Sequence, residues 1–171
     1  MPVVCAVMVP HPPIIIPEIG RGEERKISAT TAAYNAAAKF IRGAQPETLI
    51  ITTPHSTFYT DRFHISSGES ARGSFAAFRA PGIKLTVDYD TEFISELCEA
   101  ARGSELPVSG SDDDATLDHG SMVPLWFISK AFWPGKLPQI VRIGLSGRPL
   151  ADHYRLGMLI RLYNKCWGKS R

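Results

Sequence analysis

The sequence of 171 residues is poor in cysteine and contains no long apolar run. Its three cysteines, Cys5, Cys98 and Cys166, are odd in number and far apart, which argues against a disulfide framework and against a zinc ribbon. We therefore expect free thiols in a reducing compartment, and hence a cytoplasmic protein. No apolar stretch is long enough to span a bilayer, and no basic region precedes the N-terminal apolar residues, so we expect neither a membrane anchor nor a signal peptide.

Clustered positive charge and the common phosphate and hydrolase motifs are also absent. The formal net charge is +2 and the basic residues are dispersed, so nucleic acid is not an expected partner. There is no phosphate-binding loop, dinucleotide glycine fingerprint, nucleophile elbow or zincin helix. The hydrophobic fraction of 44% is ordinary for a globular protein. The sequence predicts a single domain over residues 1–171.

Apolar runs alternate with amphipathic stretches, which predicts an α/β fold. Residues 3–9 and 48–53 are β-rich apolar runs that predict strands buried on both faces, and residues 23–43 between them have the periodicity of a helix. Such a unit makes the two strands parallel neighbours. Further strands are expected at 62–66, 83–87 and 139–145, and further helices at 92–101, 122–132 and 150–163. The expected architecture is a central, mostly parallel or mixed sheet flanked by helices.

A histidine directly follows a proline at the end of each of the first two predicted strands. These histidines are His11, after Pro10, and His55, after Pro54. Proline ends a strand, and ligands of open α/β sheets bind at the carboxyl ends of the strands. Because histidine is the commonest metal ligand, we predict that His11 and His55 share a metal site. The competing interpretation is that these histidines are turn residues of a domain without metal.

His119 lies at the expected start of the helix over 122–132, between Asp118 and Gly120. A helix N-terminus favours the neutral imidazole, which predicts an acid/base role; the competing interpretation is a histidine that only caps the helix. His64, on an alternating strand with one solvated face, and His153, in the last helix, are expected to be structural or surface residues. The acidic run at 112–114 is expected to be a solvated loop.

Four motifs occur in order along the chain. They are Val-Pro-His-Pro-Pro at 9–13, Pro-His-Ser at 54–56, Phe-His-Ile-Ser followed by Gly-Glu-Ser at 63–70, and Leu-Asp-His-Gly-Ser-Met-Val-Pro-Leu at 117–125. Together they resemble the class III extradiol ring-cleavage dioxygenases of the LigB-like superfamily, and most closely the Memo-related branch linked with the AmmeMemoRadiSam system. The resemblance covers nearly the whole chain and implies a three-layer α/β sandwich of phosphorylase-like type.

The resemblance also implies a non-haem Fe(II), with Zn(II) as the alternative, held by two histidines and a carboxylate. By matching motifs, His11 and His55 are the implied metal ligands and His119 is the implied catalytic acid/base. The implied substrates are a catechol-type aromatic diol and O₂, with ring opening beside the hydroxyls. Zinc in the same site implies a hydrolytic or structural role, because zinc has no redox chemistry.

The chain departs from the family pattern at the carboxylate ligand, which family members carry well beyond the motif of His119. The nearest carboxylates here, Glu18, Glu69 and Asp118, do not match it. We therefore expect a C-terminally short catalytic domain, with a non-catalytic metal-binding or Memo-like interaction protein as the alternative function. Family members continue after the helix at 150–163 into another core strand. Without that strand a sheet edge would be uncovered, which predicts a homodimer or larger assembly.

Overall fold

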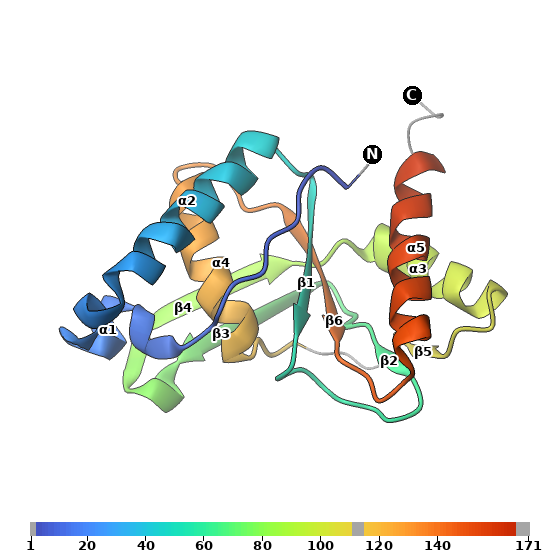
Figure 1. Cartoon of the computed structure of the whole chain (residues 1–171), viewed down its shortest axis with the longest axis horizontal. Coiled ribbons are helices and arrows are strands. Elements are labelled where there is room, and N and C mark those ends of the chain that lie inside the picture. The colour runs from blue at the N-terminus through green and yellow to red at the C-terminus, as the bar shows by residue number, and fades with distance from the viewer. Residues whose placement is uncertain (1–2, 111–114, 167–171) are drawn as a thin grey trace.

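A computed structural model describes residues 3–110 and 115–166 of the chain (Figure 1). The helices are α1 (Pro17–Gly20), α2 (Ser28–Ala44), α3 (Thr91–Gly103), α4 (His119–Phe132) and α5 (Leu150–Cys166). The strands are β1 (Thr48–Thr53), β2 (Phe63–His64), β3 (Ser70–Phe75), β4 (Ala80–Asp88), β5 (Val108–Ser109) and β6 (Gln139–Gly144). Short 3₁₀ helices are η1 (Pro13–Ile15), η2 (Glu23–Ile27) and η3 (Ala76–Phe78).

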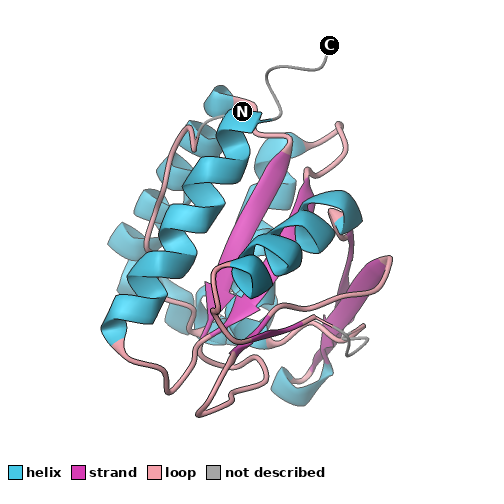
Figure 2. Cartoon of the chain, turned by 90° about the vertical axis from the view of Figure 1, so that its right-hand side faces the viewer, coloured by secondary structure: helices cyan, strands magenta, loops and turns pink. Residues whose placement is uncertain are grey.

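The centre of the fold is the parallel pair of β1 and β6, in register from Thr48 opposite Gln139 to Thr53 opposite Gly144. Helices α2 and α4 lie on one side of this pair, and α3 and α5 lie on the other (Figure 1). Figure 2, seen from the side of α5, shows the strands behind the helices of that layer. This arrangement confirms the predicted α/β class, with parallel strands packed between helices.

Two smaller ladders extend the central pair. Strands β2 and β5 are parallel, and β3 and β4 form an antiparallel hairpin. Single bridges from Ile65 to Ile143 and from Tyr89 to Ile140 connect these ladders to β6. Strand β6 is therefore covered on both sides and both faces, and five of its six residues are buried.

The helices predicted over 92–101, 122–132 and 150–163 correspond to α3, α4 and α5. Asp90 caps α3 by accepting a hydrogen bond from the backbone N–H of Phe93 at 3.0 Å, so the helix expected over 92–101 begins at Thr91. The stretch expected as one helix over 23–43 is split into η2 and α2. In the described part of the chain, no helix is both long enough and apolar enough to cross a membrane.

The prediction of a buried strand at residues 3–9 is wrong. This segment has no strand assignment, and Val3, Val4, Val7 and Met8 are exposed. A cavity of about 900 Å³ is lined by this segment on one side and by β1 on the other. A strand needs a hydrogen-bonded neighbour, and the only ladder of β1 among the described strands is that with β6, on one of its two edges. The expected parallel pairing of residues 3–9 with β1 is therefore also wrong.

Two further expectations need correction. His64 is 1% exposed, not solvated; its Nδ1 lies 3.5 Å from Oγ of Ser109, and its ring is 6.0 Å from that of Tyr59 between centroids. Ser70–Phe75, for which no strand was predicted, form β3 and pair with β4. His153 is half-buried, with its ring edge-on to Phe63 at 4.8 Å between centroids. The acidic run at 112–114 lies outside the described residues.

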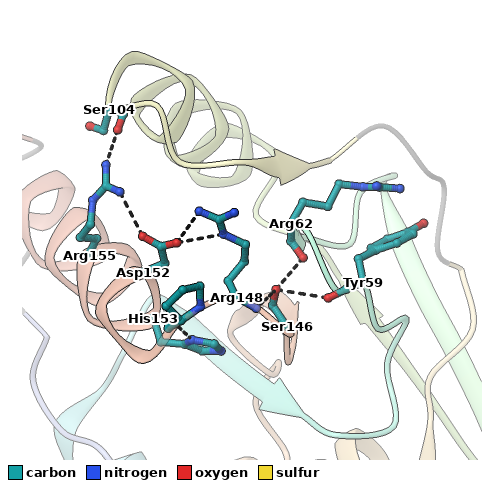
Figure 3. Close-up of polar contacts among 9 residues, drawn as sticks. Tyr59, Arg62, Ser104, Ser146, Arg148, Asp152, His153 and Arg155 are labelled. Atoms are coloured by element: carbon teal, nitrogen blue, oxygen red, sulfur yellow. Dashed lines mark hydrogen bonds and ion pairs between the residues drawn. The ribbon is translucent and has the colours of Figure 1, made fainter.

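The start of α5 is fixed by a buried carboxylate (Figure 3). Asp152 accepts hydrogen bonds from Nε of Arg148 at 2.9 Å and from Nη1 of Arg155 at 3.0 Å. The hydrogen bond from Arg148 and that from Arg155 hold the pKa of Asp152 below its usual value, against the opposing effect of burial. Arg155 also donates to the backbone carbonyl of Ser104, so this cluster joins α5 to the end of α3.

Candidate metal centre

His11 lies on the extended segment between residues 3–9 and η1, where three prolines stiffen the backbone. Tyr34 of α2 donates a hydrogen bond from its hydroxyl to the carbonyl of Pro10. Burial raises the pKa of Tyr34, so its phenol remains a hydrogen-bond donor. The Tyr34 ring stacks on Phe127 of α4 at 4.3 Å between centroids. The position of His11 is therefore set by helices α2 and α4, not by a sheet.

His55 lies in the turn directly after β1, as predicted. Thr53, the last residue of β1, is 1% exposed, and its Oγ1 accepts a hydrogen bond from the backbone N–H of His55 at 3.2 Å. Pro54 between them prevents the strand from continuing. The His55 side chain is exposed.

His119 is the first residue of α4, and its neighbour Asp118 is the N-cap. One oxygen of Asp118, Oδ1, accepts a hydrogen bond from the backbone N–H of Ser121 at 3.0 Å, and Oδ2 accepts one from its hydroxyl at 2.9 Å. The predicted helix start is therefore correct, but the capping group is Asp118. The imidazole of His119 is left available for another role.

The three imidazoles converge, although they come from residues far apart in the sequence. Nε2 of His11 and Nε2 of His55 are 2.9 Å apart. The ring centroids of His55 and His119 are 4.0 Å apart, and those of His11 and His119 are 5.8 Å apart. One nitrogen from each ring can be chosen so that all three lie within 4.8 Å of one another. His11, His55 and His119 thus form a possible metal site.

This geometry fits the donors of a bound divalent ion. Two imidazole nitrogens at about 2.1 Å from one ion, in adjacent coordination positions, are separated by about 3.0 to 3.4 Å. The observed separation of 2.9 Å between the Nε2 atoms of His11 and His55 is close to that range. The two nitrogens can also share one proton in a hydrogen bond, which requires opposite tautomers of the two rings. In both cases the two Nε2 atoms face each other across a short gap.

The surroundings of His119 favour its neutral form. Burial lowers its pKa, and the neighbouring rings of His55 and His11 lower it further, while the carboxylate of Asp118 acts in the opposite direction. The net direction is downward from the usual value near 6.5. The imidazole of His119 is therefore available at neutral pH as a proton acceptor or as a metal ligand.

Asp118 precedes His119 in the chain, but its carboxylate oxygens have other partners. In addition to Ser121, Oδ1 accepts a hydrogen bond from Oγ1 of Thr53 at 2.9 Å. Oδ2 lies 3.6 Å from Nη1 of Arg142, whose side chain is 1% exposed. Over residues 3–110 and 115–166, the cluster that could hold a metal contains three histidines and no carboxylate. Neither Glu18 nor Glu69 belongs to it.

Two more residues shape the site. Phe78 of η3 lies with its ring edge toward His119, 5.3 Å between centroids. Gly120 lies under the site, where an added Cβ would be 2.5 Å from Oγ1 of Thr53 and 3.0 Å from Cδ2 of His55. A side chain at position 120 would therefore collide with the support of His55.

Sequence reasoning identified the three histidines but not the residues that support them. Arg142, Thr53, Gly120 and Phe78 were not predicted. A signal existed for Arg142, because a lone arginine in the apolar run 139–145 needs a buried partner. His64 and His153 do not join the site, as predicted, although His64 is buried.

Comparison with known proteins agrees with this geometry. A family described as the catalytic LigB subunit of aromatic ring-opening dioxygenase matches residues 5–169. Protein CA_C1420 of Clostridium acetobutylicum is 40% identical to the chain over 159 residues. That alignment covers 88% of the chain but 33% of the relative, so the chain spans about a third of the length of the curated relative it matches.

Proposed function

Since this chain belongs to the LigB family of aromatic ring-opening dioxygenases, we propose that residues 1–171 form one catalytic domain of the extradiol type. Its substrates would be a catechol-type diol and O₂. In this reaction the ring is opened beside the hydroxyls. We also propose that the domain belongs to the Memo-related, AmmeMemoRadiSam-linked branch, which the four motifs taken together resemble most closely.

One observation carries the proposal: the 2.9 Å approach of the Nε2 atoms of His11 and His55, with the His119 ring 4.0 Å from that of His55. We assign His11 and His55 as metal ligands and His119 as the acid/base. Fe(II), when bound by these residues, would supply the redox chemistry with O₂ and leave coordination positions for the diol.

The protein residues would handle the proton and the ring of the substrate. Neutral His119 accepts the proton of a diol hydroxyl at its free ring nitrogen, because its lowered pKa leaves that nitrogen unprotonated. Phe78 provides an aromatic edge beside His119, against which the ring of the diol packs. The two histidine ligands are held by different elements, so their separation does not depend on one flexible loop.

A second function is favoured by the composition of the cluster, which holds three imidazoles and no carboxylate within the described residues. Three histidines are a common ligand set for Zn(II), which has no redox chemistry. In this alternative, His119 is a third ligand, and the domain is a non-catalytic metal-binding or Memo-like interaction protein.

Substitution of His119 separates the two functions. The test is elemental analysis after anaerobic loading with Fe(II) or Zn(II), followed by O₂ uptake and product detection with a panel of catechols. If His119 is the acid/base, His119→Gln keeps the metal and loses about 10²- to 10⁴-fold in turnover. If His119 is a ligand, the variant loses the metal.

The metal assignment has its own controls. His11→Ala and His55→Ala should each lose the metal, whereas His153→Ala, remote from the site, should keep it. Wild-type protein that holds iron but opens no diol in the panel would refute the dioxygenase proposal. Wild-type protein that takes neither metal would refute both functions.

We further propose that the protein is a homo-oligomer. The open edge of β1 and the exposed apolar side chains of residues 3–9 support this, because unpaired strand edges associate. Light scattering should find dimers or larger species at micromolar concentration, and Val7→Lys should weaken them. A wild-type monomer across that range would refute the proposal. The thiols of Cys5 and Cys98 are free, which supports the cytoplasm as the proposed location.

A further inference from the structure

The histidines of the site are supported by a hydrogen-bonded network that begins at a buried arginine. Arg142 of β6 is the largest fully buried side chain among the described residues. Its Nε donates to Oγ of Ser66 at 3.0 Å, and its Nη1 donates to the carbonyl of Thr116 at 2.7 Å. The same Nη1 lies 3.6 Å from Oδ2 of Asp118, whose side chain is 14% exposed. A buried guanidinium requires compensating negative charge, and Asp118 is one carboxylate that contributes it.

Asp118 in turn contacts both segments that carry the histidines of the closest ring pair. It caps α4, whose first residue is His119, through Ser121. It also accepts the hydroxyl proton of Thr53 at 2.9 Å, and the same Thr53 oxygen accepts the backbone N–H of His55 at 3.2 Å. One carboxylate thus fixes the backbone of His55 and that of His119 relative to a common buried charge.

Gly120 shows how closely these groups fit. A Cβ at this position would lie 2.5 Å from Oγ1 of Thr53, 2.9 Å from Oδ1 of Asp118 and 3.0 Å from Cδ2 of His55. The hydroxyl, the carboxylate and the ring of His55 therefore enclose one space that only hydrogen can fill. A movement of Thr53 would be transmitted to the His55 ring because no free volume separates them.

We propose that Thr53 and Asp118 are positioning residues that set the relative placement of His55 and His119, with Arg142 fixing the carboxylate. This inference rests on the proposed function insofar as it concerns a metal, and it adds the residues that tune the site. Groups that orient metal-binding histidines typically change metal affinity 10- to 100-fold when they are removed. The Thr53 hydroxyl acts here through the backbone of His55, not through its ring.

The test uses an isosteric change at Thr53. Thr53→Val keeps the β-branched shape but removes both the donor to Asp118 and the acceptor for His55. Thr52→Val is the matched control, because Thr52 is the adjacent residue of β1 and is exposed. Thr53→Ser restores the hydroxyl. Thermal unfolding of each variant establishes that it is folded before titration with Zn(II) or, anaerobically, with Fe(II).

We expect Thr53→Val to bind the metal about 10- to 100-fold more weakly than wild type, Thr52→Val to bind like wild type, and Thr53→Ser to recover most of the affinity. Equal affinity of the two valine variants would overturn the inference, while wild-type binding would leave the proposed function standing.

A second readout needs no metal. The ring centroids of His55 and His119 are 4.0 Å apart. At this distance the ring current of each imidazole changes the chemical shifts of the other ring's protons, so these NMR shifts report the relative placement of the two rings. Those shifts should change in Thr53→Val and not in Thr52→Val. If the wild-type protein binds no metal, the proposed function fails, and the NMR comparison alone decides the positioning role: unchanged shifts in Thr53→Val overturn it.

Discussion

Substitution of Gly120 by alanine tests the packing beneath the site most directly. Alanine is normally the better residue in a helix, by about 1 kcal/mol. At position 120, however, the new Cβ would lie 2.5 Å from Oγ1 of Thr53 and 3.0 Å from Cδ2 of His55. The Thr53 side chain is buried and hydrogen-bonded, so it cannot move aside without breaking its bond to Asp118.

The expected net effect is a loss of stability. Overpacking of a filled site costs about 1–3 kcal/mol, and a weakened hydrogen bond to a carboxylate costs about 1.5–3 kcal/mol. After subtraction of the helix-propensity gain, Gly120→Ala should destabilise the protein by about 1.5–5 kcal/mol, which corresponds to a decrease in Tm of roughly 3–20 °C for a chain of this size. Metal affinity should fall as well, because the His55 ring must shift.

Gly157 of α5 provides the matched control. It is exposed and helical, and an added Cβ would meet nothing within 4 Å. Gly157→Ala should therefore stabilise the protein by about 0.5–1 kcal/mol. Urea unfolding of the two variants, followed by circular dichroism, should give changes of opposite sign. If Gly120→Ala were as stable as Gly157→Ala and bound metal like wild type, the packing described beneath the histidines would be refuted.

Two further substitutions test the charges that hold the fold. Arg142→Met leaves Asp118 without its buried cation and should lower the free energy of unfolding by about 3 kcal/mol, near the lower end for buried pairs because Asp118 keeps three other hydrogen bonds. The exposed control Arg161→Met should change it by no more than about 0.5 kcal/mol. Equal urea midpoints of the two variants would contradict the role assigned to Arg142. Asp152 has a folded-state pKa below its unfolded value near 3.9, so its ionised form adds stability above about pH 4 that is lost as the pH falls through the folded-state pKa. Urea titrations from pH 7 to pH 3 should therefore show a smaller acid-induced loss in Asp152→Asn than in wild type, and parallel losses would show that Asp152 is not the group responsible.

The local parts of this fold could be predicted from the sequence because local groups determine them. Asp90 begins α3 by capping it, and the apolar run at 48–53 forms β1 with the same bounds. The start of α4 was placed at Asp118 and His119, which positioned one histidine of the site correctly. The Pro-His pairs also identified the other two, since proline ends extended structure regardless of its neighbours.

The parts that failed depend on what packs against them. Residues 3–9 have the composition of a core strand, but composition does not determine whether a segment finds a hydrogen-bonded neighbour, and the ladder found for β1 is with β6. His64 alternates like a half-solvated residue, yet its side chain is buried beside Tyr59 and Ser109. Convergence of His11 with His55 was predicted from a parallel strand pair that does not exist. His11 is instead held in place by the hydrogen bond from the Tyr34 hydroxyl to the carbonyl of Pro10, and no local sequence pattern indicates this bond.

The pairing of β1 with β6 has a consequence for the synthesis of the protein. Thr48 leaves the ribosome well before its partner Gln139, and at about 5–20 residues per second the delay is roughly 5–20 s. For most of this interval, until α4 has also been synthesised, the Leu-Ile-Ile run of β1 has neither its ladder partner nor the cover of α4. The nascent chain therefore presents an apolar strand for seconds, long enough for a chaperone to bind it. The histidine site, which needs α4 and the turn after β1 together, can form only after this strand has been covered.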